Sequence, residues 1–62
     1  MSDFYNKMIE TLEATRADVE RAEEGNKAAT SRVRKAMQEI KNLAQDVRKE
    51  MLELRDAGGR QG

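Results

Sequence analysis

The positively charged side chains of the C-terminal half follow a seven-residue spacing. The series, called the basic line below, consists of Lys27, Arg34, Lys41, Arg48 and Arg55. In an α-helix these residues form one outward-facing strip, which spans about 42 Å at 1.5 Å per residue. That length exceeds one turn of B-DNA, roughly 34 Å. Ammonium and guanidinium groups arranged in this way can bind the phosphates of a nucleic-acid backbone.

Further positive charges lie next to the basic line. Backbone N–H groups at the start of a helix also attract anions, and the expected helix begins at Lys27. No aromatic residue is interleaved with the positive charges, so the sequence does not predict stacking on bases. The candidate DNA-binding residues are Lys27, Arg32, Arg34, Lys35, Lys41, Arg48, Lys49 and Arg55.

The sequence offers little for catalysis or metal binding. It contains no His and no Cys, so the commonest general base, the thiol nucleophile and the usual zinc ligands are absent. Glu10 and Glu13 are one helical turn apart, but a di-iron bundle also needs a Glu-x-x-His motif. Ser31 fits a solvated or capping position. We predict no enzymatic activity, metal, cofactor or small-molecule substrate.

The net charge of zero hides a separation of charge between the two halves. Residues 1–24 carry three positive and seven negative side chains, whereas residues 25–62 carry nine positive and five negative ones. A neutral chain argues against a nucleic-acid partner, but a polarised chain permits binding through one side. Two interpretations remain open: a phosphate-binding face, or a solvated face whose charges pair with the acidic half.

The composition indicates long helices. Charged residues make up 39% of the chain, aromatic residues 3%, and Pro is absent. Gly25 can end a first helix in the left-handed conformation, and Asn26 can cap the next. We predict an all-α antiparallel hairpin over residues 1–57, with Ser2 as the first N-cap. Its helices cover about 3–24 and 27–57, its turn covers 25–26, and residues 58–62 form a flexible Gly-rich tail.

Apolar residues recur in heptads on both expected helices. A turn at Gly25 would place Tyr5, Leu12 and Val19 beside Val47, Ile40 and Val33, respectively. The apolar stripe is wider than a two-helix seam requires, and so short a chain buries little surface by itself. We therefore predict a homodimer, a four-helix bundle or coiled coil. The expected core and dimer residues are Phe4, Tyr5, Met8, Ile9, Leu12, Val19, Val33, Met37, Ile40, Leu43, Val47, Met51 and Leu54.

One block of sequence is similar to a known family. The residues Gly25-Asn26-Lys27-Ala28-Ala29 and Arg32-Val33-Arg34-Lys35, continuing through Met37–Gln45 to Arg48-Lys49-Glu50, resemble the bacterial linker-histone-like proteins of the chlamydial histone type. The resemblance covers about residues 20–55. It implies a small nucleoid-associated protein that binds DNA without strong sequence preference and compacts it. It also implies that the basic residues of the block, from Lys27 to Lys49, contact phosphates.

Larger members of that family carry a long tail rich in Lys, Ala and Pro, whereas this chain ends in Gly-Gly-Arg-Gln-Gly. We therefore expect modest affinity, or binding that depends on dimerisation. The predicted partners are double-stranded DNA and a second copy of the chain, in a cytoplasmic, nucleoid-associated location. No apolar run approaches the roughly 20 residues of a membrane span. The alternative hypothesis is a helical-hairpin dimerisation or protein-interaction module without nucleic-acid binding.

Overall fold

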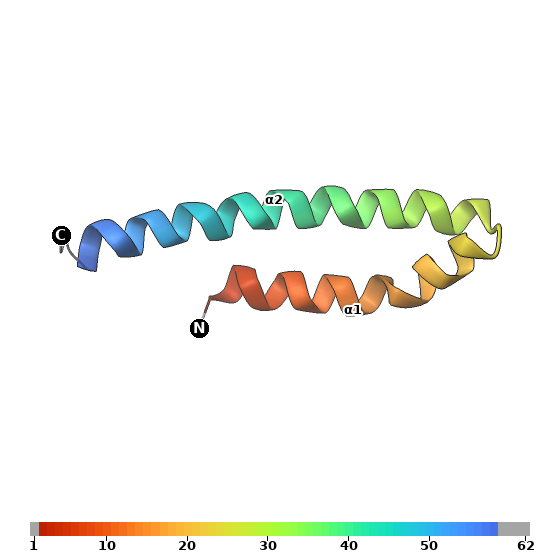
Figure 1. Cartoon of the computed structure of the whole chain (residues 1–62), viewed down its shortest axis with the longest axis horizontal. Helices are drawn as coiled ribbons and strands as arrows, with labels where there is room; N and C mark the ends of the chain where they lie inside the picture. Colours follow the sequence, from red (N-terminus) through yellow and green to blue (C-terminus); the bar gives the residue numbers. More distant parts are fainter. Residues whose placement is uncertain (1, 59–62) are drawn as a thin grey trace.

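The computed structural model describes residues 2–58, which form two antiparallel helices (Figure 1). Helix α1 covers Asp3–Glu23 and helix α2 covers Lys27–Gly58. The hairpin measures 51 Å along its longest axis and 16 and 14 Å across it. The predicted all-α helical hairpin is confirmed. Beyond Gly58, the predicted flexible tail lies outside the described residues.

Helix α1 begins at a capping serine. Tyr5 N–H donates a hydrogen bond to Ser2 Oγ at 3.1 Å, which satisfies one of the free donors of the first turn. Ser2 Oγ in turn donates to Glu50 Oε1 on α2. The predicted N-cap is therefore confirmed, and its hydroxyl also links the open end of the hairpin to α2.

The turn between the helices has the conformation that glycine permits most easily. Gly25 has a φ of 101°, in the region where side chains are strained. Gly25 N–H donates to Ala22 O and Asn26 N–H donates to Arg21 O, both at 3.0 Å, which is the Schellman arrangement. Asn26 Oδ1 then accepts a hydrogen bond from Ala29 N–H at 3.0 Å. The two residues therefore end α1 and start α2 as predicted.

The apolar heptads of α2 face α1. Ala29 and Leu43 are buried, and Val33, Ala36, Ile40 and Val47 are partly buried. Leu54 is 59% exposed because α1 begins level with Glu50 and does not extend far enough to cover it. The seam predicted for the second helix is therefore confirmed as far as α1 extends.

The strip that helix α1 presents to α2 agrees only in part with the prediction, since it includes the predicted core residue Met8. The residues that are buried or partly buried on it are Met8, Thr11, Thr15, Asp18 and Ala22. Tyr5, Leu12 and Val19 are 53%, 50% and 37% exposed, so their predicted packing beside Val47, Ile40 and Val33 is wrong.

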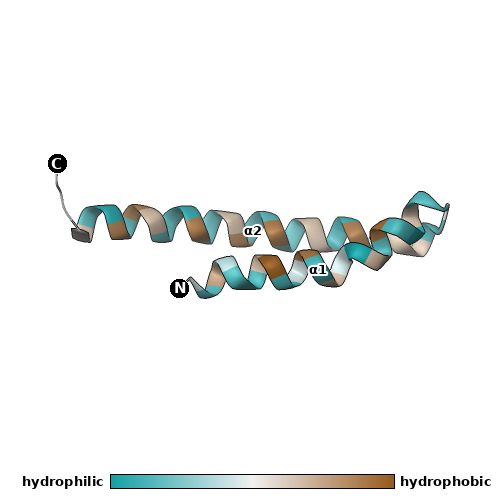
Figure 2. Cartoon of the chain, turned by 60° about the horizontal axis from the view of Figure 1, so that its bottom comes forward, coloured by the Kyte–Doolittle hydropathy of each residue, from teal (hydrophilic) through white to brown (hydrophobic). Residues whose placement is uncertain are grey.

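Polar residues can occupy this seam because their hydrogen bonds are satisfied. Thr15 is the one buried polar residue among those described, and its Oγ1 donates to Thr11 O at 2.6 Å. Asp18 forms ion pairs. Several large apolar side chains remain exposed on both helices. Figure 2 shows hydrophobic segments along the length of α1 and α2. Over residues 2–58, neither helix is long and apolar enough to cross a membrane.

Candidate nucleic-acid interface

All eight predicted DNA-binding residues lie on α2, and all are exposed. The basic line begins opposite α1 near the turn, at Lys27. The side of α2 that faces α1 also repeats every seven residues, through Ala29, Ala36 and Leu43 and through Val33, Ile40 and Val47. The basic line therefore keeps the same position relative to α1 along the hairpin, on the outer side of α2.

The middle of α2 carries a cluster of hydrogen-bond donors. Arg34, Lys35 and Lys41 line a shallow, open hollow together with the polar residues Ser31 and Gln38 and the apolar residues Val33 and Met37. Ser31, Arg34, Gln38 and Lys41 are three or four residues apart, so they share one face of the helix. A guanidinium, two ammonium groups, a hydroxyl and an amide can all donate hydrogen bonds to phosphate oxygens.

Two residues of this cluster, Ser31 and Gln38, were not among the predicted DNA-binding residues. Gln38 was not singled out, and Ser31 was interpreted as a solvated or capping residue. Their spacing from Arg34 and Lys41 is the signal that could have identified them, since neutral donors one turn from a cation extend the same face.

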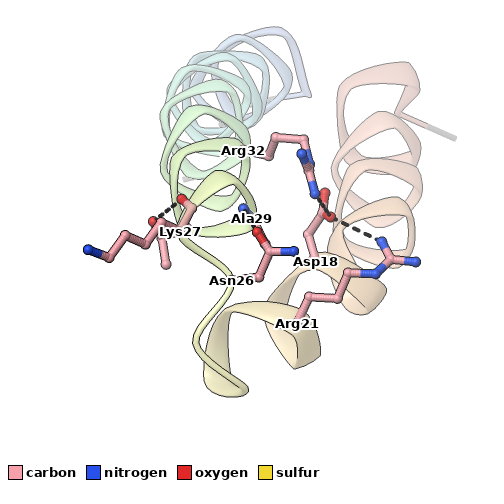
Figure 3. A network of polar contacts seen from close by, with 7 residues as sticks. Asp18, Arg21, Asn26, Lys27, Ala29 and Arg32 are labelled. Atoms are coloured by element: carbon pink, nitrogen blue, oxygen red, sulfur yellow. Dashed lines mark hydrogen bonds and ion pairs between the residues drawn. The ribbon is translucent and has the colours of Figure 1, made fainter.

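Arg32 is engaged inside the hairpin. Its guanidinium lies 2.9 Å from Asp18 Oδ1, and Asp18 also accepts from Arg21 at 3.4 Å (Figure 3). The hydrogen bond from Arg32, aided by the charges of Arg32 and Arg21, lowers the pKa of Asp18. The same contact raises the pKa of Arg32. Arg32 thus differs from the residues of the basic line, because its side chain joins α2 to α1.

Two other predicted residues lie close to carboxylates. Arg55 Nε is 3.7 Å from Asp56 Oδ1. Lys49 borders a small hollow at the open end of the hairpin, which is also lined by Phe4, Asp46, Glu50 and Glu53. Nearby negative charge weakens the attraction of a cation for phosphate. Lys49 and Arg55 are therefore the less favourable members of the predicted set.

The remaining five cations have no such partner. Within residues 2–58, no ion pair involves Lys27, Arg34, Lys35, Lys41 or Arg48. In the same part of the chain, the Asp18–Arg32 pair is the one ion pair that connects the helices. The acidic residues of α1 thus leave the basic line of α2 unneutralised. The excess of negative charge in the N-terminal half and of positive charge in the C-terminal half therefore lie on two different helices, α1 and α2.

No metal-binding cluster accompanies this surface. Among the residues that the structure describes, no group of three or more Asp and Glu side chains could hold a metal ion.

The chain matches the model of a known protein family. The family model of the histone H1-like protein Hc1 matches residues 2–57, which include all of α1 and nearly all of α2. No curated protein and no solved structure shows a significant match. The matched region contains every cation of the candidate interface.

Proposed function

Because the chain belongs to the family of the histone H1-like protein Hc1, we propose that it binds double-stranded DNA through its phosphates and helps to organise the chromosome. The family is one of histone-like DNA-binding proteins of the nucleoid. The proposal adds a binding surface, the outer face of α2, and a mode of binding without sequence preference. It also places the protein in the cytoplasm, on the nucleoid.

The observation that carries this proposal is the exposed row of unpaired cations on α2. Lys27, Arg34, Lys41 and Arg48 are exposed, seven residues apart and free of ion pairs within residues 2–58. A rigid helix holds their spacing, so several phosphates along one groove edge can be contacted together. Lys35, Ser31 and Gln38 add donors in the middle of the row.

The chemistry of the row supports binding that is indifferent to sequence. Ammonium and guanidinium groups that contact phosphates carry no base information. Both aromatic residues, Phe4 and Tyr5, are on α1 and thus away from the row. Single-strand binding is supported by aromatic side chains that stack on unpaired bases, and the row has no such side chain beside it.

A band-shift experiment with two unrelated duplexes tests the proposal. At about 50 mM salt, both duplexes should be shifted at similar protein concentrations, and the shift should weaken sharply at about 200 mM salt. A strong preference for one duplex would contradict binding through phosphates alone. The absence of a shift at low salt would reject DNA binding.

A second candidate function rests on the exposed apolar residues. Tyr5, Leu12 and Met51 are among the large hydrophobic side chains left on the surface of the single hairpin. They support the alternative that the chain is a dimerisation or protein-interaction module. Homodimerisation is also part of the main proposal, since a dimer doubles the number of phosphate contacts. The two functions predict different results in the band-shift experiment. The main proposal predicts that DNA is shifted at low salt, and the alternative predicts that it is not.

A further inference from the structure

The part of α2 that lies farthest from α1 is neutral and polar. Two series of residues with a seven-residue spacing face α1, so one position of each heptad lies directly opposite the midpoint between them. On α2 this position is occupied by Ser31, Gln38 and Gln45, which are all exposed. These three residues, called the polar stripe below, present a hydroxyl and two amides at the crest of the hairpin.

Positive charges lie on both sides of the polar stripe. The two neighbouring heptad positions are each rotated about 50° from it around the helix axis. The basic line occupies one of them, and Lys35 and Lys49 belong to the other. Glu39 is rotated about 100° from the stripe, toward the helix seam. The outer face of α2 therefore has an uncharged centre with cations along each side.

This distribution of charge favours insertion of α2 into a groove over binding across the outside of a duplex. On the outside, the crest of α2 would meet the phosphates first, and the crest has no charge to neutralise them. In a groove, the crest meets base edges and the cations on its two sides meet the phosphates of the two groove edges. The minor groove, about 6 Å wide, is too narrow for a helix of about 10–12 Å, whereas the major groove is about 12 Å wide.

We infer that the outer face of α2 lies in the major groove, with the polar stripe on the base edges; this inference rests on the proposed DNA binding. From Ser31 to Gln45 the stripe covers about 21 Å, or about six base pairs at 3.4 Å each. The next residue at this heptad position is Leu52, which is 50% exposed, so the polar contact ends before it. Because the two helices lie side by side (Figure 1), α1 stays on the far side of α2 from the duplex.

The chemistry of the polar stripe agrees with binding that has no strong sequence preference. The amides of Gln38 and Gln45 and the hydroxyl of Ser31 can each donate and accept a hydrogen bond. Every base pair presents donors or acceptors in the major groove, so these side chains can find a partner on any sequence. The inference therefore adds a choice of groove without adding a choice of sequence.

Two modified duplexes of one sequence distinguish the grooves without changing the phosphates. In the first, each cytosine carries a glucosylated hydroxymethyl group at C5, which projects into the major groove. In the second, 2-aminoadenine replaces adenine and adds an amino group to the minor groove. Both changes are uncharged. In band shifts with the unmodified protein, the first change should weaken binding by about tenfold or more, because it displaces α2 from the base edges, and the second should alter it by about twofold or less.

Each other result of this comparison has a definite meaning. Equal affinity for the glucosylated and the unmodified duplex would overturn the placement in the major groove. A loss with 2-aminoadenine that equals or exceeds the loss with the glucosylated duplex would overturn it as well. If the unmodified duplex is not shifted at about 50 mM salt, the proposed DNA binding itself is rejected.

Cross-linking tests the orientation of α2 by a separate route. Because the chain has no native Cys, Gln38→Cys provides a single thiol on the polar stripe. Asn6→Cys is the matched control, since Asn6 is exposed on the side of α1 that lies away from α2. The probes are duplexes that carry a disulfide tether on cytosine N4, in the major groove, or on guanine N2, in the minor groove. Circular dichroism verifies that both variants are helical.

The helical Gln38→Cys variant should exchange with the major-groove tether at least about tenfold faster than with the minor-groove tether, because the minor groove does not admit the helix. The Asn6→Cys variant should react slowly with both. Equal reaction of Gln38→Cys with the two tethers, or faster reaction with the minor-groove tether, would overturn the inference. Faster reaction of Asn6→Cys than of Gln38→Cys with the major-groove tether would also overturn it.

Discussion

The guanidinium of Arg32 and the carboxylate of Asp18 lie 2.9 Å apart and join the two helices near the turn. This contact divides the positive charges of α2 into two groups. Arg32 stabilises the hairpin, whereas Lys27, Arg34, Lys35, Lys41 and Arg48 form no ion pair within residues 2–58. The division predicts that neighbouring basic residues have different effects when they are replaced.

Reversing two charges on the outer face of α2 should abolish DNA binding. Arg34→Glu combined with Lys41→Glu removes two phosphate contacts and adds two repulsive charges, so affinity at low salt should fall by about 100-fold or more. The measurement is a band-shift titration. The matched control is Lys7→Glu with Arg16→Glu on α1, which changes the net charge equally. An equal loss in both variants would show that net charge matters and the outer face does not.

Replacing Arg32 should affect the fold more than the binding. Arg32→Ala removes the ion pair with Asp18, so the midpoint of thermal unfolding should fall. DNA affinity should fall less than for Arg34→Ala, because Arg32 is engaged with α1. Circular dichroism melts and band shifts on the same two variants compare the effects. The reverse order of DNA affinities would place Arg32 in the interface.

The same ion pair should make stability depend on pH in the acid range. Hydrogen bonding to Arg32 lowers the pKa of Asp18 below its unfolded value, which is about 3.9. The stabilisation is complete above the unfolded pKa and is lost as the pH falls through the lower folded pKa. Thermal melts between pH 2 and pH 6 should therefore lose stability below about pH 4. Asp18→Asn should show a smaller loss, and an unchanged pH profile would contradict the assignment.

Gly25 should resist substitution for conformational reasons. Its φ of 101° is unfavourable for side chains, whereas a Cβ at this position would meet no atom within 4 Å. Gly25→Ala should therefore reduce the free energy of unfolding by about 1–2 kcal/mol. Gly25→Asn should cost less, because Asn adopts the left-handed region more readily. Equal losses measured by urea unfolding would indicate that backbone conformation is not the cause.

Local signals in the sequence predicted most of the fold. Ser2, Gly25 and Asn26 act through hydrogen bonds within a few residues, and they mark helix ends that the structure confirms. The heptads of α2 also predicted its buried side. Spacing and charge were sufficient to identify the basic line, because outward residues of a helix need no tertiary contact to be exposed.

The same reasoning predicted the seam of α1 only in part, since Met8 was expected there and is partly buried. Hydrophobicity favours Leu12 and Val19 over Thr15 and Asp18 for burial, yet Thr15 is buried and Asp18 partly buried, whereas Leu12 and Val19 are exposed. Their cost is offset by contacts that depend on the folded geometry, such as the hydroxyl bond of Thr15 to Thr11 O. The engagement of Arg32 with Asp18 depends on the same geometry, and heptad spacing does not reveal it.

The salt dependence of DNA affinity tests the central claim most directly. The affinity of the unmodified protein for one duplex is measured between about 50 and 300 mM salt, and the logarithm of the association constant is plotted against that of the salt concentration. Four or five contacts per protomer, and up to ten per dimer, predict a slope of roughly −4 to −9. Arg34→Glu with Lys41→Glu should make any residual slope shallower. A slope near zero would contradict binding through the phosphate backbone.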